Sequence, residues 1–153
     1  MPNWCTNRIT VRGPKYKIDG LYRAIKEKDE FLRILRPVPK NLRKLPYDTG
    51  LPAPKKKLVI DGWERLYDWY IEKWGTKWDV STERLKKHAD GKGIHGWFES
   101  AWNPPLEALA YYCDNNSDVY IKIDFIEPGA QFKGYWCSDG RSEVHDYKLK
   151  GQE

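Results

Sequence analysis

The stretch VYIKIDFI, residues 119–126, carries the clearest alternation in this sequence. Apolar residues occupy every second position from Val119 to Phe125, and Tyr120, Lys122 and Asp124 stand between them. A period of two predicts a β-strand with one buried face and one exposed face. The residues after it, Glu127-Pro128-Gly129, predict a turn.

A second alternating stretch, WCTNRITVR, occupies residues 4–12. Cys5, Ile9 and Val11 share one face, while Trp4 and the polar residues share the other. Asn7 falls in phase with the apolar face. We therefore expect this side chain to be buried, where its amide needs hydrogen-bond partners.

Outward from these two strands the sequence predicts two helices and two hairpins. In residues 94–102, Ile94, Phe98 and Trp102 are expected on one face and His95, Trp97 and Glu99 on the other. A helical period predicts a helix over 16–28, and Asn103-Pro104-Pro105 begins a second helix that Asn115-Asn116 ends. A turn at Gly91-Lys92-Gly93 joins strands 83–90 and 94–102 into a hairpin. A further hairpin pairs 132–137 with 143–149.

Residues 61–74 predict a further helix, because aromatic and aliphatic residues recur at helical spacing from Trp63 to Trp74. Asp61 with Glu64 matches a capping box at the start of this helix. Gly75 stands where a helix often ends in the left-handed conformation.

Without the segment between residues 36 and 80, the predicted order is strand, helix, strand, strand, helix, strand. This is the ferredoxin-like split βαβ order. We therefore expect a single α+β domain over residues 1–153 with an insert at about 36–80, and a C-terminal hairpin that extends the sheet or packs beside it.

The insert begins with a basic segment, residues 36–58, that is rich in proline. Five prolines argue against a regular element, so a long loop is expected, and such loops are often functional or disordered. The only acidic residue of this segment is Asp48. Its basic residues are Arg36, Lys40, Arg43, Lys44, Lys55, Lys56 and Lys57.

Composition narrows the class of protein. The three cysteines are widely spaced and form no CxxC pair, so neither a disulfide framework nor a zinc site is expected. We expect no signal peptide, the sequence has no apolar run of membrane-spanning length, and a soluble protein of the reducing cytosol is expected.

Charge is unevenly distributed along the chain. The net charge is +5, but residues 1–60 carry 15 Lys and Arg against 5 Asp and Glu. This asymmetry favours contact with an anionic partner, either nucleic acid, a nucleotide or an acidic protein. The alternative is that the charge serves only solubility.

No catalytic or cofactor motif is recognisable. The chain has neither a glycine-rich phosphate loop nor a GxSxG elbow, and its three histidines lack metal-ligand spacing. Asp124, Glu127 and Asp139 could bind a divalent ion and support a metal-dependent hydrolase, but one strand residue and two turn residues are the preferred interpretation. We expect no enzyme, no metal and no cofactor.

Aromatic residues beside lysine give better support for binding. In Trp74-Gly75-Thr76-Lys77-Trp78-Asp79 two indoles flank a lysine, a pattern that could stack a base or hold a cation. Trp74 is expected in the core as part of the helix stripe. Lys77, Trp78, Trp97 and Trp102 complete the candidate binding residues, although Glu99 and Asp124 on the same sheet would repel phosphate.

Four motifs in order carry a family resemblance: Met1 to Asn7, Trp74 to Asp79, Ala101 to Pro105 and Glu127 to Gly129. Together they resemble the YubB ferredoxin-like family of phages, prophages and conjugative plasmids, over residues 1 to about 137. The resemblance implies a ferredoxin-like fold and a mobile-element origin. It implies no activity, and no iron–sulfur cluster, since three scattered cysteines cannot supply four ligands.

Two functions therefore stay open. The first is an accessory binding protein that engages nucleic acid or a nucleotide through the basic segment and exposed aromatics. The second is a phage- or plasmid-encoded inhibitor of a host defence protein, acting by protein–protein binding. The motif residues Asn3, Trp4, Asn7, Thr76, Lys77 and Trp102 form either a shared site or a folding signature.

Overall fold

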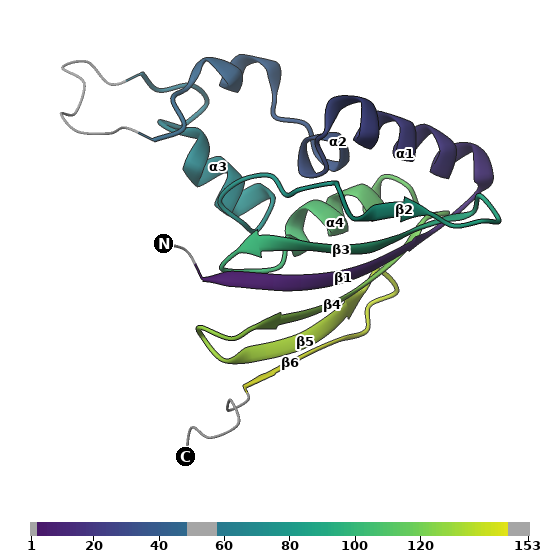
Figure 1. Ribbon diagram of the computed structural model, residues 1–153. Helices are drawn as coiled ribbons and strands as arrows, with labels where there is room; N and C mark the ends of the chain where they lie inside the picture. Colours follow the sequence, from purple (N-terminus) through teal and green to yellow (C-terminus); the bar gives the residue numbers. More distant parts are fainter. Residues whose placement is uncertain (1–2, 49–57, 147–153) are drawn as a thin grey trace.

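A computed structural model describes residues 3–48 and 58–146 of the chain. Six antiparallel strands form one sheet in the order β2-β3-β1-β4-β5-β6 (Figure 1). The four strands of the ferredoxin-like core, β1 to β4, follow one another along the chain as expected and lie side by side in the sheet. The C-terminal hairpin, β5 and β6, extends the sheet. The strands are β1 Trp4–Arg12, β2 Leu85–Lys87, β3 Gly93–Ala101, β4 Tyr120–Glu127, β5 Phe132–Cys137 and β6 Ser142–Asp146.

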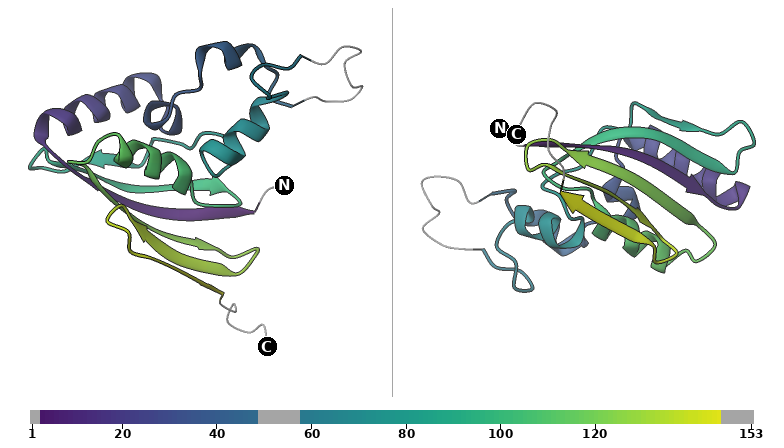
Figure 2. Two further views of the ribbon diagram at one scale, coloured as in Figure 1. Left: turned by 180° about the vertical axis from the view of Figure 1, so that it is seen from behind. Right: turned by 90° about the horizontal axis from the view of Figure 1, so that it is seen from below.

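The helices cover one face of this sheet and leave the other open, as the view from below shows (Figure 2). No described helix has the length and apolar character to cross a membrane. The helices are α1 Lys15–Lys28, α2 Leu32–Leu35, α3 Leu66–Lys73 and α4 Leu106–Asp114, with a 3₁₀ helix, η1, at Lys40–Lys44.

The core lies between the sheet and the helices, and the alternation in the sequence explains it. Ile9 and Val11 of β1 and Ile121 and Ile123 of β4 are buried on the helix-covered face. Leu109 of α4 packs in the same core. The two predicted strands and the helix at 16–28 are thus confirmed as the frame of the domain.

Asn7 is buried on the same face, as its position in the alternation predicted. Its amide nitrogen donates to Ser100 Oγ at 2.9 Å and to the carbonyl oxygens of Cys5 and Phe98 at 3.1 and 3.3 Å. Ser100 in turn donates to the carbonyl oxygen of Asn103 at 2.6 Å. This network fixes the end of β3 against β1.

The predicted helix at 61–74 is wrong at its start. Asp61 and Gly62 have positive φ angles of 52° and 85° and form a tight turn between bridged Ile60 and Trp63, so Asp61 caps no helix. Helix α3 begins at Leu66. The predicted apolar stripe is confirmed in part, because Tyr70 and Trp74 are buried as expected. Ile71, which helical spacing also places on the stripe, is exposed, and Trp69 is buried in its place.

The described part of the basic segment is not a structureless loop. Pro39 precedes η1, and Val38, Leu42 and Leu45 are buried in the core. Three apolar side chains at these spacings anchor the segment despite its prolines. Lys55, Lys56 and Lys57 lie outside the described residues.

Trp102 does not continue the face of Ile94 and Phe98. It lies one residue beyond β3 with a φ angle of 70°, and 46% of it is exposed. The positive φ breaks the alternation, which is why the strand pattern misplaced this side chain.

Candidate functional site

Four exposed or half-buried tryptophans and two cations lie between the middle of β3 and the start of β1. Lys77 contacts Trp78 and Trp102, and Trp78 contacts Trp4, through ring–ring or cation–ring pairs. Arg84 pairs with Trp97, and a shared pocket joins this pair to Trp4 and Trp78. We call this surface the tryptophan band and define it as Trp97, Arg84, Trp4, Trp78, Lys77 and Trp102.

The paired strands β1 and β3 supply the first indoles. Trp4 alternates with buried Cys5 and so emerges on the open face of β1, and Trp97 emerges on the same face of β3, opposite Arg8. Each is 40% exposed. Strand pairing therefore places two residues that are far apart in the chain on one face, where both line one pocket.

The segment after α3 supplies Lys77 and Trp78. Gly75, with a φ of 88°, ends the helix, and buried Thr76 donates its hydroxyl hydrogen to the carbonyl oxygen of Ala101 at 2.7 Å. The Asp79 carboxylate accepts the backbone N–H of Leu32 at 2.8 Å at the start of α2. These two anchors place the Trp78 ring 6.2 Å from the Trp4 ring, centroid to centroid.

Arg84 lies over Trp97, with its guanidinium carbon 4.7 Å from the ring centroid. Gly96 lets the backbone of Arg84 lie close to β3, because a Cβ at residue 96 would overlap the carbonyl oxygen of Arg84. The pair is a cation–π contact in which the planar guanidinium can stack on the indole.

Lys77 lies among three aromatic rings. Its Nζ is 3.7 Å from the ring centroid of Trp102, 5.8 Å from that of Tyr67 and 6.0 Å from that of Trp78. No carboxylate of the described residues lies within ion-pair distance of this ammonium group. Its three N–H donors are therefore available to an anion.

A pocket of about 320 Å³ opens in the middle of the band. Trp4, Trp78 and Trp97 line it with Arg84, and Asp79 and Glu99 add two carboxylates. This volume is at the lower end of the range for small-ligand sites. The pocket offers π-faces for stacking and one cation for a phosphate. Its carboxylates can accept N–H donors, although Asp79 already accepts the backbone N–H of Leu32.

The structure thus brings together Lys77, Trp78, Trp97 and Trp102, all predicted as binding residues. Trp4 and Arg84 complete the band, and Tyr67 borders it at Lys77. The predicted binding residues included neither Arg84 nor Tyr67. The sequence placed Trp4 and Trp97 each on a polar strand face. It could not show that these faces are neighbours, because that depends on the pairing of β1 with β3.

The basic residues of 36–48 do not join the band. Arg36 lies over the ring of Tyr111 at 4.3 Å and donates to the carbonyl oxygen of Lys73 at 3.4 Å. It therefore ties the segment to α3 and α4. Lys40, Arg43 and Lys44 are exposed on η1.

The carboxylates of the alternative metal site do not meet. Glu127 and Asp139 lie at opposite ends of β4, roughly 20 Å apart for a strand of this length. Glu127 is buried and accepts the N–H groups of Gly129 and Ala130, both at 2.6 Å, while Asp139 binds Arg141. Across the described ranges no three His, Cys, Asp or Glu side chains group closely enough for a metal.

The thiol of Cys5 is unsuited to nucleophilic chemistry. Burial raises its pKa to about 12, although a hydrogen bond with Ser100 opposes this shift. The thiolate is the nucleophilic form, so at neutral pH this cysteine is inert. It is a core residue, as the sequence predicted.

Comparison with known proteins places the fold. Residues 73–153 match the model of the ferredoxin-like domain in Api92-like protein. The crystal structure of api92 from Yersinia pseudotuberculosis is similar over 97% of this chain and 99% of that chain, with a TM-score of 0.55 and 14% sequence identity. At this identity the likeness shows the fold alone.

No curated protein matches the chain. The two matches support the ferredoxin-like fold, and they do not confirm the name YubB. Because the family model covers more than half of the sequence, the chain belongs to the family of Api92-like proteins with a ferredoxin-like domain.

Proposed function

We propose that this protein is a non-enzymatic binding protein that engages single-stranded nucleic acid or a nucleotide through the tryptophan band. The observation that carries the proposal is the presence of accessible indoles beside Arg84 and Lys77 in two contacting groups that meet at one pocket. Bases stack on indoles, and cations between the indoles neutralise phosphates.

The energetics favour such a ligand. Stacking of one base on an aromatic side chain contributes about 1–3 kcal/mol and tolerates any base, since every base has a π-face. A neighbouring cation adds a contact whose strength falls with salt. Two or three stacked bases would contribute about 2–9 kcal/mol before the cost of ordering the strand and the side chains.

Negative charge on the open face shapes the expected path of a ligand. Asp124 lies on β4 and would repel phosphates that crossed the whole sheet, whereas Glu99 lines the pocket of the band itself, so phosphates there are expected at Arg84 and Lys77. The expected path runs from Trp97 in the middle of β3 over Trp4 and Trp78 to Trp102. This path differs from the RRM mode, in which the sheet face itself carries the strand.

Binding of fluorescently labelled single-stranded oligonucleotides by anisotropy tests the proposal. Trp97→Ala and Trp102→Ala should each weaken binding about tenfold, the effect of losing one stacked base. Tyr16→Ala is the matched control, because Tyr16 is an exposed aromatic residue on α1, outside the band. Equal losses in all three variants, or no binding of any oligonucleotide or nucleotide, would rule the proposal out.

A second candidate is a phage- or plasmid-encoded inhibitor of a host defence protein in the bacterial cytoplasm. It draws on the resemblance to the YubB family and on an apolar patch at β5 and β6, where Phe132 and exposed Val144 line a pocket with Leu106. Exposed apolar patches often serve protein partners. A pull-down from host lysate that recovers no stoichiometric protein would exclude this candidate.

A further inference from the structure

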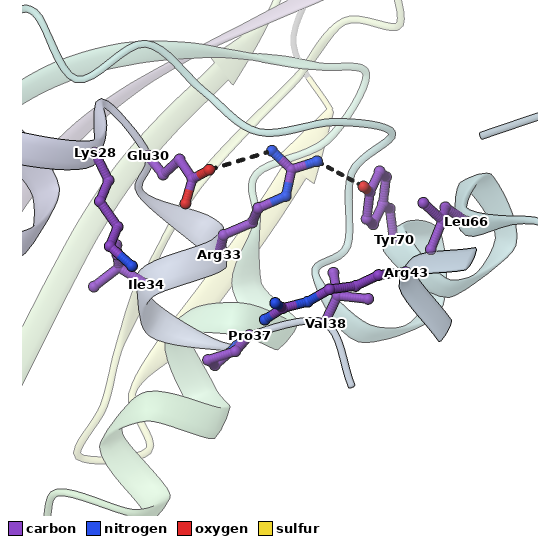
Figure 3. A pocket seen from close by; sticks show the side chains of 9 residues that line it. All are labelled: Lys28, Glu30, Arg33, Ile34, Pro37, Val38, Arg43, Leu66 and Tyr70. Atoms are coloured by element: carbon purple, nitrogen blue, oxygen red, sulfur yellow. Dashed lines mark hydrogen bonds and ion pairs between the residues drawn. The ribbon is translucent and has the colours of Figure 1, made fainter. Parts of the chain in front are cut away.

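A second pocket lies in the helix layer, apart from the tryptophan band. It has a volume of about 690 Å³ and opens between α2, η1 and α3 (Figure 3). It shares no residue with the band. A volume of this size can hold a molecule as large as a nucleotide.

Arg33 is held in place at one wall of this pocket. Its Nη2 donates to the hydroxyl oxygen of Tyr70 at 2.7 Å, and its Nη1 lies 3.8 Å from Glu30 (Figure 3). Its guanidinium carbon is also 5.7 Å from the ring centroids of Tyr70 and Trp74. Because both rings are buried, the guanidinium is positioned before any ligand arrives.

Two further cations line the pocket and have no carboxylate partner. Neither Lys28 nor Arg43 makes an ion pair or side-chain hydrogen bond within the described ranges, and Arg43 reaches toward Pro37 and Val38 (Figure 3). With Glu30 as the one lining carboxylate, three cations leave a net charge of two positive units. This charge complements a phosphomonoester, which carries close to two negative charges at neutral pH.

The rest of the lining is apolar. Ile34, Pro37, Val38 and Leu66 supply carbon surface beside the cations. A ligand that fills the pocket therefore needs a charged end and a planar or apolar body. Inorganic phosphate would satisfy only the first requirement.

We propose that this pocket binds a small phosphomonoester with a planar or apolar body, of which nucleoside monophosphates are the probes. Arg33 and Arg43 bind the phosphate, since guanidinium groups donate paired hydrogen bonds to phosphate oxygens. Lys28 adds charge, and the body lies against Ile34 and Leu66. This proposal does not rest on the tryptophan band.

Calorimetric titration of the full chain with adenosine and guanosine monophosphates, the two nucleosides and inorganic phosphate tests this assignment. At least one monophosphate should bind at least about tenfold more tightly than its nucleoside and than phosphate. Arg43→Ser should weaken that binding about tenfold, the loss of one charge-assisted hydrogen bond. Lys44→Ser is the matched control, since Lys44 is exposed on the same 3₁₀ helix and does not line the pocket.

A second readout covers Arg33, whose replacement would disturb the packing around Tyr70. In wild-type protein the Nε–Hε NMR signal of Arg33 should shift on titration with the monophosphate. Absence of saturable binding, equal losses in Arg43→Ser and Lys44→Ser, or an unmoved Arg33 signal would each overturn the proposal. Trp97→Ala should leave monophosphate binding unchanged. A negative result for this pocket is therefore distinguishable from a negative result for oligonucleotide binding by the tryptophan band.

Discussion

Two groups of aromatic residues in this protein have the same chemistry and opposite environments. Trp74 is fully buried, stacks on Tyr70 with centroids 4.1 Å apart and planes 4° apart, and donates its indole N–H to the carbonyl oxygen of Arg36 at 2.9 Å. Trp97 and Trp102 are exposed, and the described residues offer their indole N–H groups no acceptor. The first group packs in the core, and the second group is accessible to solvent.

The difference teaches how position decides the role of a tryptophan. Trp74 lies at the end of α3 facing the core, whereas Trp97 lies on the sheet face that no helix covers. Trp78 is intermediate, because it contacts Trp4 but remains half-buried. An indole on an open sheet face adds nothing to the core, so its presence there favours a binding role.

The largest expected effect separates the two groups by stability. Trp74→Ala should lower the free energy of unfolding by about 3–5 kcal/mol, because it leaves a cavity and removes the stack on Tyr70. Trp97→Ala should lower it by less than about 1 kcal/mol. Urea denaturation of both variants measures this contrast, and similar losses would show that Trp97 belongs to the structural group.

The next effect concerns the polar network that fixes β3 against β1. Asn7→Ala should cost about 2–3 kcal/mol, since it leaves buried groups at Ser100 and Phe98 without their donor. Thr10→Ala, on the opposite face of the same strand, is the control and should cost under about 1 kcal/mol. A loss at Asn7 no larger than the control would show that the network does not stabilise the fold.

The alternation in residues 4–12 and 119–126 was sufficient to predict both central strands and the burial of Cys5 and Asn7. Helix starts were harder to place. Asp61 matches a cap by residue type but has a left-handed backbone, which spacing alone does not reveal. The band was half predictable: Lys77 and Trp78 are adjacent in sequence, whereas Arg84 reaches Trp97 only through strand pairing and a glycine contact.

A smaller effect on stability is expected when the buried thiol of Cys5 ionises at high pH. Burial raises the pKa of Cys5 to about 12, above the ordinary value of 9.0 that applies in the unfolded chain. The neutral thiol therefore stabilises the fold fully below pH 9, and this contribution is lost as the pH rises from 9 toward 12. Alkylation by iodoacetamide at pH 8, followed by mass spectrometry, should leave Cys5 unmodified in folded protein and modify it in urea.

The smallest effect tests the charge of the band. Lys77→Gln should reduce the slope of log affinity against log salt for a single-stranded oligonucleotide by about 1, the contribution of one phosphate contact. Lys44→Gln, outside the band, should leave the slope unchanged. Equal slopes for wild type and Lys77→Gln would show that Lys77 contacts no phosphate.

The most direct measurement follows the indole N–H signals of all tryptophans by NMR while a single-stranded oligonucleotide is added. If the ligand binds at the tryptophan band, the signals of Trp4, Trp78, Trp97 and Trp102 should shift and saturate together, while those of Trp69 and Trp74 stay in place. Saturable binding that leaves the four band signals unmoved, or no binding at low salt, would contradict this proposal.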